Sequence, residues 1–341
     1  MLENGWSACA QLCSRLGPRQ DAAWYTGRVE RPLVFITRRL VLAPQSVLGA
    51  GIQIDLHDSE DAVQRGEMLR RVREASALLA VPGDRVDKEL LDAAPRLRIV
   101  ANHAVGYDNV DVPACTARGV WVTNTPDVLT DATADLTWAL ILALARRLGE
   151  GDRMVRAGRF RGWAPTMLLG RDLRGRTLGI LGYGRIGRAV ARRAEGFGMN
   201  VLFSARGGGV PFDELLPQAD ILSVHCPLTP QTRHLMGPAE LLRMKRGSLL
   251  VNTARGPIVD EAALVAALES GHLGGAALDV YENEPAVHPG LLGRDDVVLL
   301  PHLGSATQQT RESMARIALE QVERVLRGER PTTAVNEVTS P

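Results

Sequence analysis

Short apolar runs alternate with helix-like segments along most of the chain, from residue 33 almost to the C-terminus. The runs cover residues 33–37, 52–57, 77–81, 98–104 and 120–124, and then residues 177–182, 200–205, 221–225, 248–253, 275–280 and 297–302. Runs that are apolar on both faces and are joined by helices are typical of parallel strands covered on both sides. Two consecutive sets therefore predict an α/β fold with two doubly wound parallel-sheet domains.

The segments between and after these runs have helical patterns. Examples between strands of the first set are "RGEMLRRVREA" and "DKELLDAAP". The apolar run "LTWALILALA" at residues 136–145 is too short to span a bilayer and predicts a buried helix, for which Thr130 and Asp131 are plausible caps. The segment after Pro301 predicts a single amphipathic helix with no strand following it.

These patterns divide the chain into four parts. Residues 1–32 lack a clean periodicity and a long apolar core, so we expect a disordered extension that is not a signal peptide. Residues 33–125 form the first domain, residues 126–303 the second, and residues 304–335 a helix that returns to the first domain. We expect a ligand in the cleft between the domains, outside the carboxyl ends of the strands.

A glycine-rich segment, "GYGRIG" at residues 182–187, follows a predicted strand and opens a predicted helix. In this context the first glycine permits a tight turn, the second lets a pyrophosphate approach, and the third lets the helix pack closely on the strand. The N–H groups of Arg185 and Ile186 then face the phosphates, helped by the helix dipole. The sequence therefore predicts a dinucleotide site, with a glycine-rich turn that binds nothing as the alternative.

The next strand ends without the acid that usually binds the ribose of NAD. Ala205 occupies the expected position, and the next acid in the sequence is Asp213. Ser204 can hydrogen-bond a phosphate and Arg206 can pair with one, while the three glycines after Arg206 leave room and free N–H groups. This favours the 2′-phosphate of NADP. The alternative is that Arg206 is a solvated surface residue and both cofactors bind.

Polar residues also stand at the ends of three later strands. Arg255 follows the strand at 248–253, Glu284 lies beyond the strand at 275–280, and His302 ends the last run. Each residue alone has an ordinary structural explanation, as a turn cap, a loop acid or a packed histidine. Their order on successive strand ends, downstream of a dinucleotide loop, favours a catalytic set. Asp279 either contacts the nicotinamide amide or caps the next turn.

Composition removes several other classes of function. The formal net charge is +1, so no electrostatic argument favours nucleic acid or a membrane surface as a partner. The four cysteines form no CxxC pair and no zinc-like spacing with histidine, so we predict no metal. A reduced, cytoplasmic setting is the default for such a chain.

Six ordered segments resemble the D-isomer-specific 2-hydroxyacid dehydrogenases, and among them the glyoxylate/hydroxypyruvate reductases. The segments are "VGYDNVDVPACTARGVWVTNTP", "GRTLGILGYGRIGRAVARRAEGFGM", "HCPLTPQTRHLMG", "VNTARGPIVDEAALVAALESG", "ALDVYENEP" and "LPHLGSAT". The resemblance extends from about residue 33 to 335. It implies a flavodoxin-like substrate domain, a Rossmann NAD(P)-binding domain and a homodimer formed through the cofactor domain.

The resemblance also implies roles for individual residues. His302 is the acid/base, Glu284 its partner and Arg255 the substrate anchor. The backbone N–H groups at Val105 and Gly106 bind the substrate carboxylate. The implied cofactor contacts are Gly182, Tyr183, Gly184, Arg185, Ile186, Gly187, Ser204, Arg206, Thr253, Ala254, Asp279 and Gly304. The chemistry suits these residue types, because an imidazolium can protonate the reduced carbonyl oxygen and a guanidinium can hold a carboxylate.

The expected function is an NADPH-preferring reductase of glyoxylate and hydroxypyruvate, with NAD(H) as a second cofactor. The Trp-bearing segment "RFRGWAPTMLLGRDLRG" is typical of this subgroup. Alternatives within the chemistry are a 2-ketogluconate reductase or a broad D-2-hydroxyacid dehydrogenase that uses NADH, followed by phosphoglycerate and phosphite dehydrogenases. Outside enzymes, the alternative is a cofactor-sensing, corepressor-like binding protein. The Pro82-Gly83-Asp84 loop departs from the closest relatives, and Asp84 is either solvated or alters substrate choice.

Overall fold

The first described residues lead directly into a five-stranded parallel sheet. The computed structural model describes residues 31–338, so the extension expected over residues 1–32 lies almost wholly outside the described residues. The strands are β1 (Leu33–Ile36), β2 (Gln53–Leu56), β3 (Ala75–Ala80), β4 (Ile99–Asn102) and β5 (Trp121–Thr123). They pair in the order β2-β1-β3-β4-β5. This is the flavodoxin-like order of a doubly wound sheet, as predicted.

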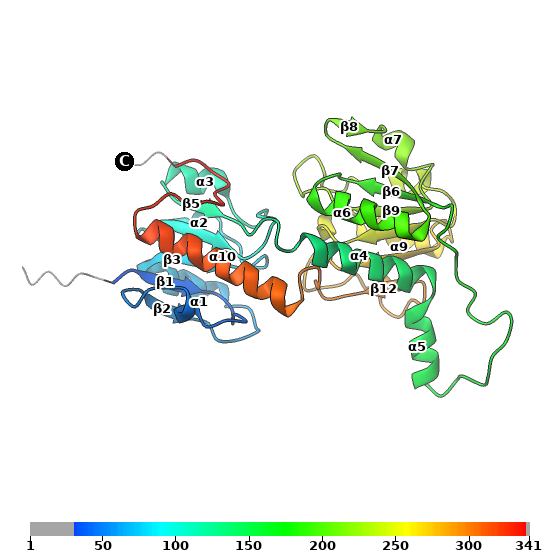
Figure 1. Cartoon of the computed structure of the whole chain (residues 1–341), viewed down its shortest axis with the longest axis horizontal. Coiled ribbons are helices and arrows are strands. Elements are labelled where there is room, and N and C mark those ends of the chain that lie inside the picture. Colours follow the sequence, from blue (N-terminus) through cyan, green and yellow to red (C-terminus); the bar gives the residue numbers. More distant parts are fainter. Residues whose placement is uncertain (1–30, 339–341) are drawn as a thin grey trace, which may run out of the picture. The chain divides into compact units, whose positions relative to one another are not determined.

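Helices cover both faces of this sheet, because its strands are apolar on both faces. One face packs on α1 (Arg65–Arg71), α2 (Lys88–Ala93) and α3 (Val112–Ala117). The other face packs on α10 (Gln308–Leu326), whose Leu319 and Val322 join a core cluster with Ile36 and Leu79. Figure 1 shows α10 lying along β3 and β4. Beyond α10, Ala334 forms an antiparallel bridge with β5.

A seven-stranded sheet forms the second half of the fold. Its strands are β6 (Thr177–Leu181), β7 (Asn200–Ala205), β8 (Gly208–Gly209), β9 (Ile221–Val224), β10 (Leu249–Asn252), β11 (Gly275–Leu278) and β12 (Val297–Leu299). They pair in the order β12-β11-β10-β9-β6-β7-β8, and every pair except β7–β8 is parallel. The strand order reverses between β6 and β9, which marks the place where a Rossmann sheet binds its dinucleotide.

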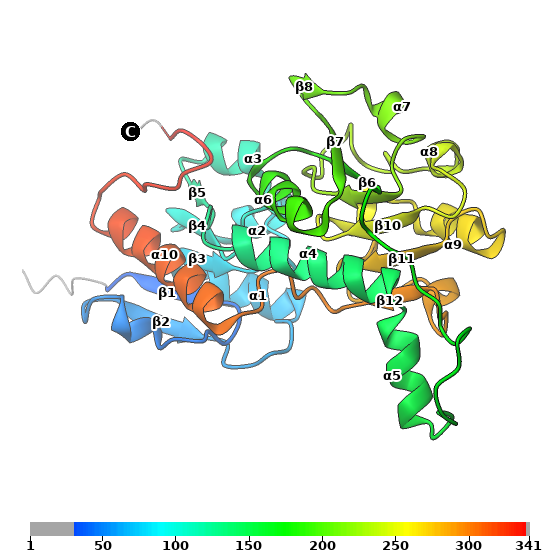
Figure 2. The same ribbon diagram turned by 45° about the vertical axis from the view of Figure 1, so that its right-hand side comes forward.

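Helices again lie on both faces of the second sheet (Figure 2). One face packs on α4 (Thr130–Ala145) and α6 (Arg185–Ala194), and the other packs on α7 (Phe212–Leu215), α8 (Pro238–Arg243) and α9 (Glu261–Glu269). Trp138 of α4 donates a hydrogen bond to the carbonyl of Val190 at 3.0 Å, which joins α4 to α6. The remaining helix, α5 (Leu148–Arg156), projects away from the sheet in both views. Single 3-10 turns occupy Pro44–Ser46, Val72–Glu74, Glu195–Phe197, Gly256–Ile258 and Pro289–Leu291.

The buried helix predicted over residues 136–145 is confirmed as part of α4, but its predicted caps are wrong. The N-cap is Leu129, which makes no side-chain cap, and Thr130 and Asp131 form the first turn. The Asp131 carboxylate there still interacts favourably with the helix dipole. Within residues 31–338, no helix combines the length and apolarity that a membrane crossing requires.

Candidate active site

The glycine loop after β6 has the geometry that a dinucleotide requires. Gly182 has a positive φ of 96°, and a Cβ there would lie 2.4 Å from the backbone that follows β9. A Cβ at Gly187 would lie 2.2 Å from the carbonyl of Gly182, whereas Gly184 faces open space. Because α6 starts at Arg185 without a side-chain cap, its first N–H groups, including that of Ile186, are free for an anion. These residues fit a bound pyrophosphate.

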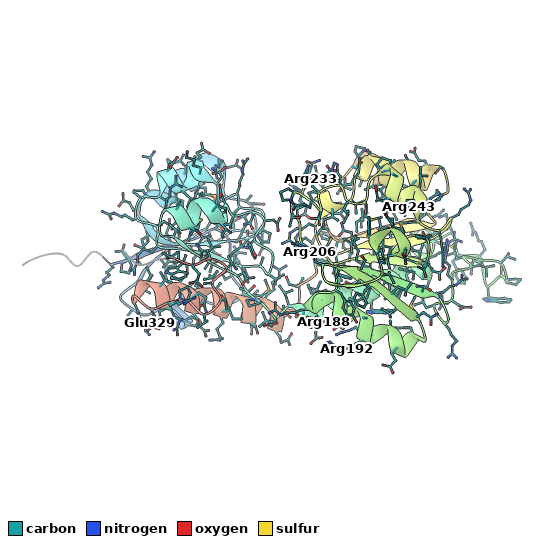
Figure 3. The ribbon with its side chains drawn as sticks, turned by 90° about the horizontal axis from the view of Figure 1, so that it is seen from above. Arg188, Arg192, Arg206, Arg233, Arg243 and Glu329 are labelled. Carbon is teal, nitrogen blue, oxygen red and sulfur yellow. The ribbon has the colours of Figure 1, made fainter. Side chains whose placement is uncertain are left out.

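The expected 2′-phosphate position lies on a hairpin that the sequence did not predict. Gly208 and Gly209 form β8 and pair with Ser204 and Ala205 of β7. The three glycines after Arg206 therefore do more than leave room for a phosphate. Two of them belong to the sheet, and only Gly207 remains in the turn. Arg206 occupies the same turn and is exposed (Figure 3), whereas Ser204 is buried.

Tyr183 of the glycine loop lies against the same edge of the sheet. Its ring stacks on that of Phe203 in β7, with ring centroids 3.8 Å apart. The stack joins the turn after β6 to the strand that carries Ser204. The pyrophosphate loop and the expected ribose position are thereby held next to each other.

The predicted acid/base pair comes together beyond β11 and β12. His302 Nδ1 lies 3.0 Å from Glu284 Oε2, while Glu284 Oε1 accepts a hydrogen bond from Tyr281 N at 3.0 Å. Burial acts to raise the pKa of Glu284, but the hydrogen bond and charge of His302, the Tyr281 N–H and the charge of Arg255 hold it below its ordinary value. Glu284 is therefore a carboxylate near neutral pH, which can accept a hydrogen bond from Nδ1 of His302.

The backbone of His302 is held in an uncommon conformation. Its φ is 57°, in the left-handed region that few residues other than glycine adopt. The carboxylate of Asp279 accepts hydrogen bonds from Leu303 N at 2.6 Å and Gly304 N at 2.8 Å, and thus caps the turn. Burial raises the pKa of Asp279, although these N–H groups and the charge of His302 oppose the rise. Strain that the surroundings impose in this way is typical of functional sites.

The predicted substrate anchor meets the predicted carboxylate-binding loop. Arg255 Nε donates to Asp108 Oδ1 at 2.8 Å, and Nη1 donates to the carbonyl of Ala254 at 2.7 Å. A Cβ at Gly106 would lie 1.9 Å from Arg255 Nη2, so a larger residue there would displace the guanidinium from its present position. Asp108 is a site residue that sequence reasoning missed, although it stands within the "VGYDNVD" segment two residues after Gly106.

Two of the expected cofactor residues are tied together through α4. Thr253 Oγ1 lies 3.0 Å from Thr137 Oγ1, and Thr137 Oγ1 donates to the carbonyl of Thr133 at 2.8 Å. Thr133 Oγ1 then donates to the carbonyl of Gly304 at 3.0 Å. The end of β10 and the turn after His302 are therefore positioned by one helix.

The loop at residues 82–84 is built into the substrate domain. Asp84 is only 4% exposed, and its carboxylate accepts hydrogen bonds from Val81 N at 2.9 Å and from Thr37 Oγ1. Arg38 lies 3.6 Å away. Burial raises the pKa of Asp84 and outweighs the lowering by these partners. The interpretation of Asp84 as a solvated residue is therefore wrong.

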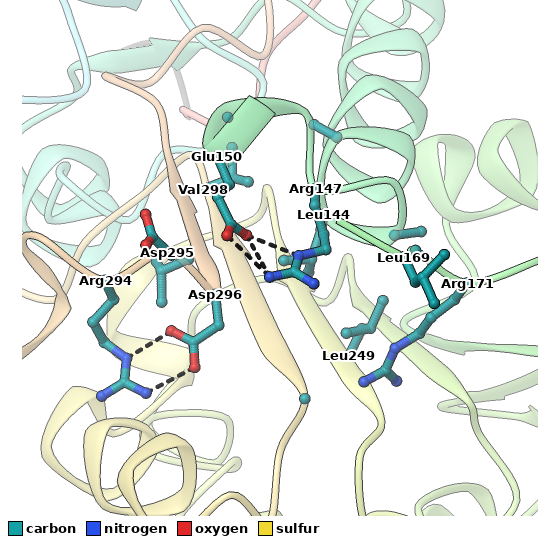
Figure 4. A pocket seen from close by; sticks show the side chains of 16 residues that line it. Leu144, Arg147, Glu150, Leu169, Arg171, Leu249, Arg294, Asp295, Asp296 and Val298 are labelled. Carbon is teal, nitrogen blue, oxygen red and sulfur yellow. Dashed lines mark hydrogen bonds and ion pairs between the residues drawn. The ribbon is translucent and has the colours of Figure 1, made fainter. Parts of the chain in front are cut away.

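A cavity of about 580 Å³ lies elsewhere, near the amino ends of β10 and β12. Its lining includes Leu144, Arg147, Glu150, Leu169, Arg171 and Arg294. Figure 4 shows that Arg147 pairs with Glu150 and that Arg294 pairs with Asp296. Ligands of doubly wound sheets bind at the carboxyl ends of the strands, so this cavity is separate from the acid/base pair.

Comparisons with known proteins agree with this fold. The family model described as "D-isomer specific 2-hydroxyacid dehydrogenase, NAD binding domain" matches residues 138–304. A glyoxylate reductase of Thermococcus litoralis is 46% identical over 322 residues, which cover 90% of this chain and 97% of that protein. A crystal structure of a protein from Thermus thermophilus is similar with a TM-score of 0.85 and 45% identity, over 89% of this chain and 100% of that one. An NADPH-dependent glyoxylate/hydroxypyruvate reductase of Sinorhizobium meliloti, in complex with NADP and malonate, has a TM-score of 0.77 and 36% identity over 89% and 97% of the two chains.

The chain therefore belongs to the D-isomer-specific 2-hydroxyacid dehydrogenases, and it is an NAD(P)-dependent oxidoreductase. Within that family it is similar to the glyoxylate reductases. The family resemblance and the fold class predicted from the sequence are both confirmed.

Proposed function

We propose that this enzyme reduces glyoxylate and hydroxypyruvate to glycolate and D-glycerate. The observation that carries the proposal is the hydrogen bond between His302 and Glu284, with the charge of Arg255 close enough to act on Glu284. A small 2-oxo acid needs a proton donor and a carboxylate anchor, and this set offers both. The names of similar proteins support the choice of the two acids. Initial-rate measurements test it, and a folded enzyme that turns over neither acid would contradict it.

In this mechanism the protein residues bind the acid and move one proton. Arg255 and the N–H groups of Val105 and Gly106 hold the substrate carboxylate. A nicotinamide cofactor held by the glycine loop would supply the hydride for the carbonyl carbon. Because Glu284 engages Nδ1 of His302, Nε2 is the atom that donates the proton to the carbonyl oxygen. Glu284 stabilises the imidazolium and fixes the orientation of its ring.

NADPH is the preferred cofactor in this proposal. No acid stands at the end of β7 to repel a 2′-phosphate, since the strand ends at Ala205. Arg206 is exposed there, and its guanidinium offers a fork of donors that suits a phosphate. The β7–β8 hairpin holds the backbone beside Arg206 and so limits where its side chain reaches.

Replacing Arg206 with alanine should lower kcat/KM for NADPH by about tenfold and leave kcat/KM for NADH within twofold. A hydrogen bond to a charged group contributes about 1.5–3 kcal/mol, and tenfold corresponds to about 1.4 kcal/mol. Initial rates with both cofactors measure the effect. Arg316→Ala on the exposed side of α10 is the matched control. Equal losses with the two cofactors, or a wild-type enzyme that prefers NADH, would contradict the phosphate assignment.

We also propose that the enzyme is a homodimer formed through the cofactor domain. The segment from α5 onwards exposes several large apolar side chains, and exposed patches of this kind mark interaction surfaces. They are Val155 (61%), Phe160 (50%), Trp163 (82%) and Leu169 (64%). Light scattering should give twice the chain mass of 36.9 kDa, and a monomer at micromolar concentration would contradict the proposal.

The setting that we propose for the enzyme is the reducing cytoplasm. Cys115 and Cys226 are free and buried, which supports this setting.

A further inference from the structure

Three consecutive carbonyl groups of the loop after β4 are held from the interior of the substrate domain. The carbonyl of Ala104 accepts a hydrogen bond from Thr125 N at 2.9 Å. The carbonyl of Val105 accepts one from Asn124 Nδ2 at 2.8 Å, and that of Gly106 accepts one from Asn102 Nδ2 at 2.7 Å. The donors stand at or just beyond the carboxyl ends of β4 and β5, so they share the rigid edge of one sheet.

These bonds also determine where the N–H groups of the loop point. The peptide bonds from 104 to 107 are trans, so each N–H is directed away from the carbonyl of the same peptide. The three clamped peptides carry the N–H groups of Val105, Gly106 and Tyr107. Within residues 31–338, none of these three groups donates a hydrogen bond. A row of free N–H groups beside a guanidinium suits an anion.

We propose that Asn102 and Asn124 are positioning residues, which clamp the loop carbonyls so that its N–H groups bind the substrate carboxylate opposite Arg255. The inference rests on the proposed reduction of small 2-oxo acids. Asn124 acts on the peptide that carries the Gly106 N–H, and Asn102 acts on the peptide that carries the Tyr107 N–H. Neither asparagine needs to touch the substrate.

A third asparagine, Asn109, and the loop at residues 82–84 fix the orientation of Asn102. Asn109 Nδ2 donates to Asn102 Oδ1 at 3.1 Å, which leaves Nδ2 of Asn102 to face the Gly106 carbonyl. The same Asn109 amide lies 3.2 Å from the carbonyl of Val81 and 3.0 Å from that of Asp84. Since the buried Asp84 carboxylate holds this turn closed, the 82–84 loop supports the clamp from behind.

Asn124→Ala and Asn124→Asp test the clamp, because both remove the donor to Val105 and the first adds no charge. Each should raise KM for glyoxylate at least tenfold and weaken the binding of oxalate to the NADPH complex by a similar factor. The NADPH affinity should stay within twofold and kcat within threefold. Asn102→Asp should behave alike, since it keeps the acceptor for Asn109 and replaces the donor to Gly106 with an oxygen of a buried carboxylate. Asn200→Asp is the matched control, because the Asn200 amide donates to the carbonyl of Gly175 in the cofactor domain and makes no contact with this loop.

The outcomes separate the clamp from the proposed function. Unchanged KM and unchanged oxalate affinity in the Asn124 variants would overturn the clamp, while a wild-type enzyme that reduces glyoxylate would still support the function. A wild-type enzyme that reduces neither acid would overturn the function, and oxalate binding would still decide the clamp. A general structural defect would lower NADPH affinity and oxalate affinity together. If Asn124→Ala shows such a general defect, the NADPH and oxalate affinities of Asn102→Asp test the clamp instead.

Discussion

Replacing His302 with glutamine should lower kcat for glyoxylate reduction by about 10²–10⁴-fold at neutral pH and leave NADPH affinity within twofold. Glutamine is polar and close in size to histidine, but it cannot release a proton to the carbonyl oxygen. The effect belongs in kcat because the proton is transferred only as the carbonyl is reduced. Initial rates at saturating NADPH and a fluorescence titration of NADPH measure the two quantities.

The control for this change is His272→Gln in the same domain. The His272 ring lies 3.0 Å from the carbonyl of Met244 and is not part of the strand-end set, so its loss should leave kcat within twofold. A folded His302→Gln enzyme with unchanged kcat would remove His302 as the proton donor. An enzyme that also loses NADPH would show that the change had disturbed the turn capped by Asp279.

The pH profile gives the same assignment a second readout. The pKa of Glu284 lies below its ordinary value, so its charge is present at neutral pH and is lost only as the pH falls through that lowered pKa. Above that point the carboxylate can accept a hydrogen bond from Nδ1 of His302. The acid decrease in kcat/KM that protonation of Glu284 causes should therefore be absent in Glu284→Gln. An identical acid limb in the two enzymes would show that Glu284 does not act through His302.

The fold was largely predictable because it depends on local patterns. Every predicted strand is present. The glycine loop was predictable because a Cβ at Gly182 or Gly187 would collide with neighbouring backbone, so its turn requires glycine at these positions. The exceptions also have local causes. The helix cap failed because Leu129 takes the N-cap position ahead of Thr130, and a two-residue strand of glycines such as β8 has no apolar alternation to reveal it.

The candidate site was predictable at strand ends but not in its supporting contacts. His302, Glu284 and Arg255 could be named because parallel strands bring their carboxyl ends together. The partners Asp108 and Asn124 bond to residues 147 and 19 positions away in the sequence, and no spacing rule connects such pairs. The burial of Asp84 was not predictable for the same reason, since a polar residue in a Pro-Gly turn is compatible with solvent, whereas its partner Thr37 lies 47 positions away in the sequence.

Replacing Arg255 with alanine should reduce kcat/KM for glyoxylate by about 10²–10⁴-fold, through a higher KM together with a lower kcat. Each hydrogen bond to a charged group contributes about 1.5–3 kcal/mol, so the loss of a two-pronged contact accounts for this range. Arg255→Lys should recover only a small part, because an ammonium keeps the charge but not the planar fork. Initial rates and oxalate affinity measure both variants, and Arg316→Ala again serves as the control.

The contact between Arg255 and Asp108 lets this prediction distinguish anchoring from general charge. Asp108 Oδ1 engages Nε at 2.8 Å and Ala254 engages Nη1, so the guanidinium is aimed by the protein before any substrate arrives. Asp108→Asn keeps the shape but weakens that hold, and it should raise KM for glyoxylate several-fold with kcat nearly unchanged. If Arg255 acted only as a nearby positive charge, removal of the opposing carboxylate would instead tighten substrate binding and lower KM. A lower KM in Asp108→Asn would therefore reject the anchor and leave Arg255 as an electrostatic neighbour of Glu284.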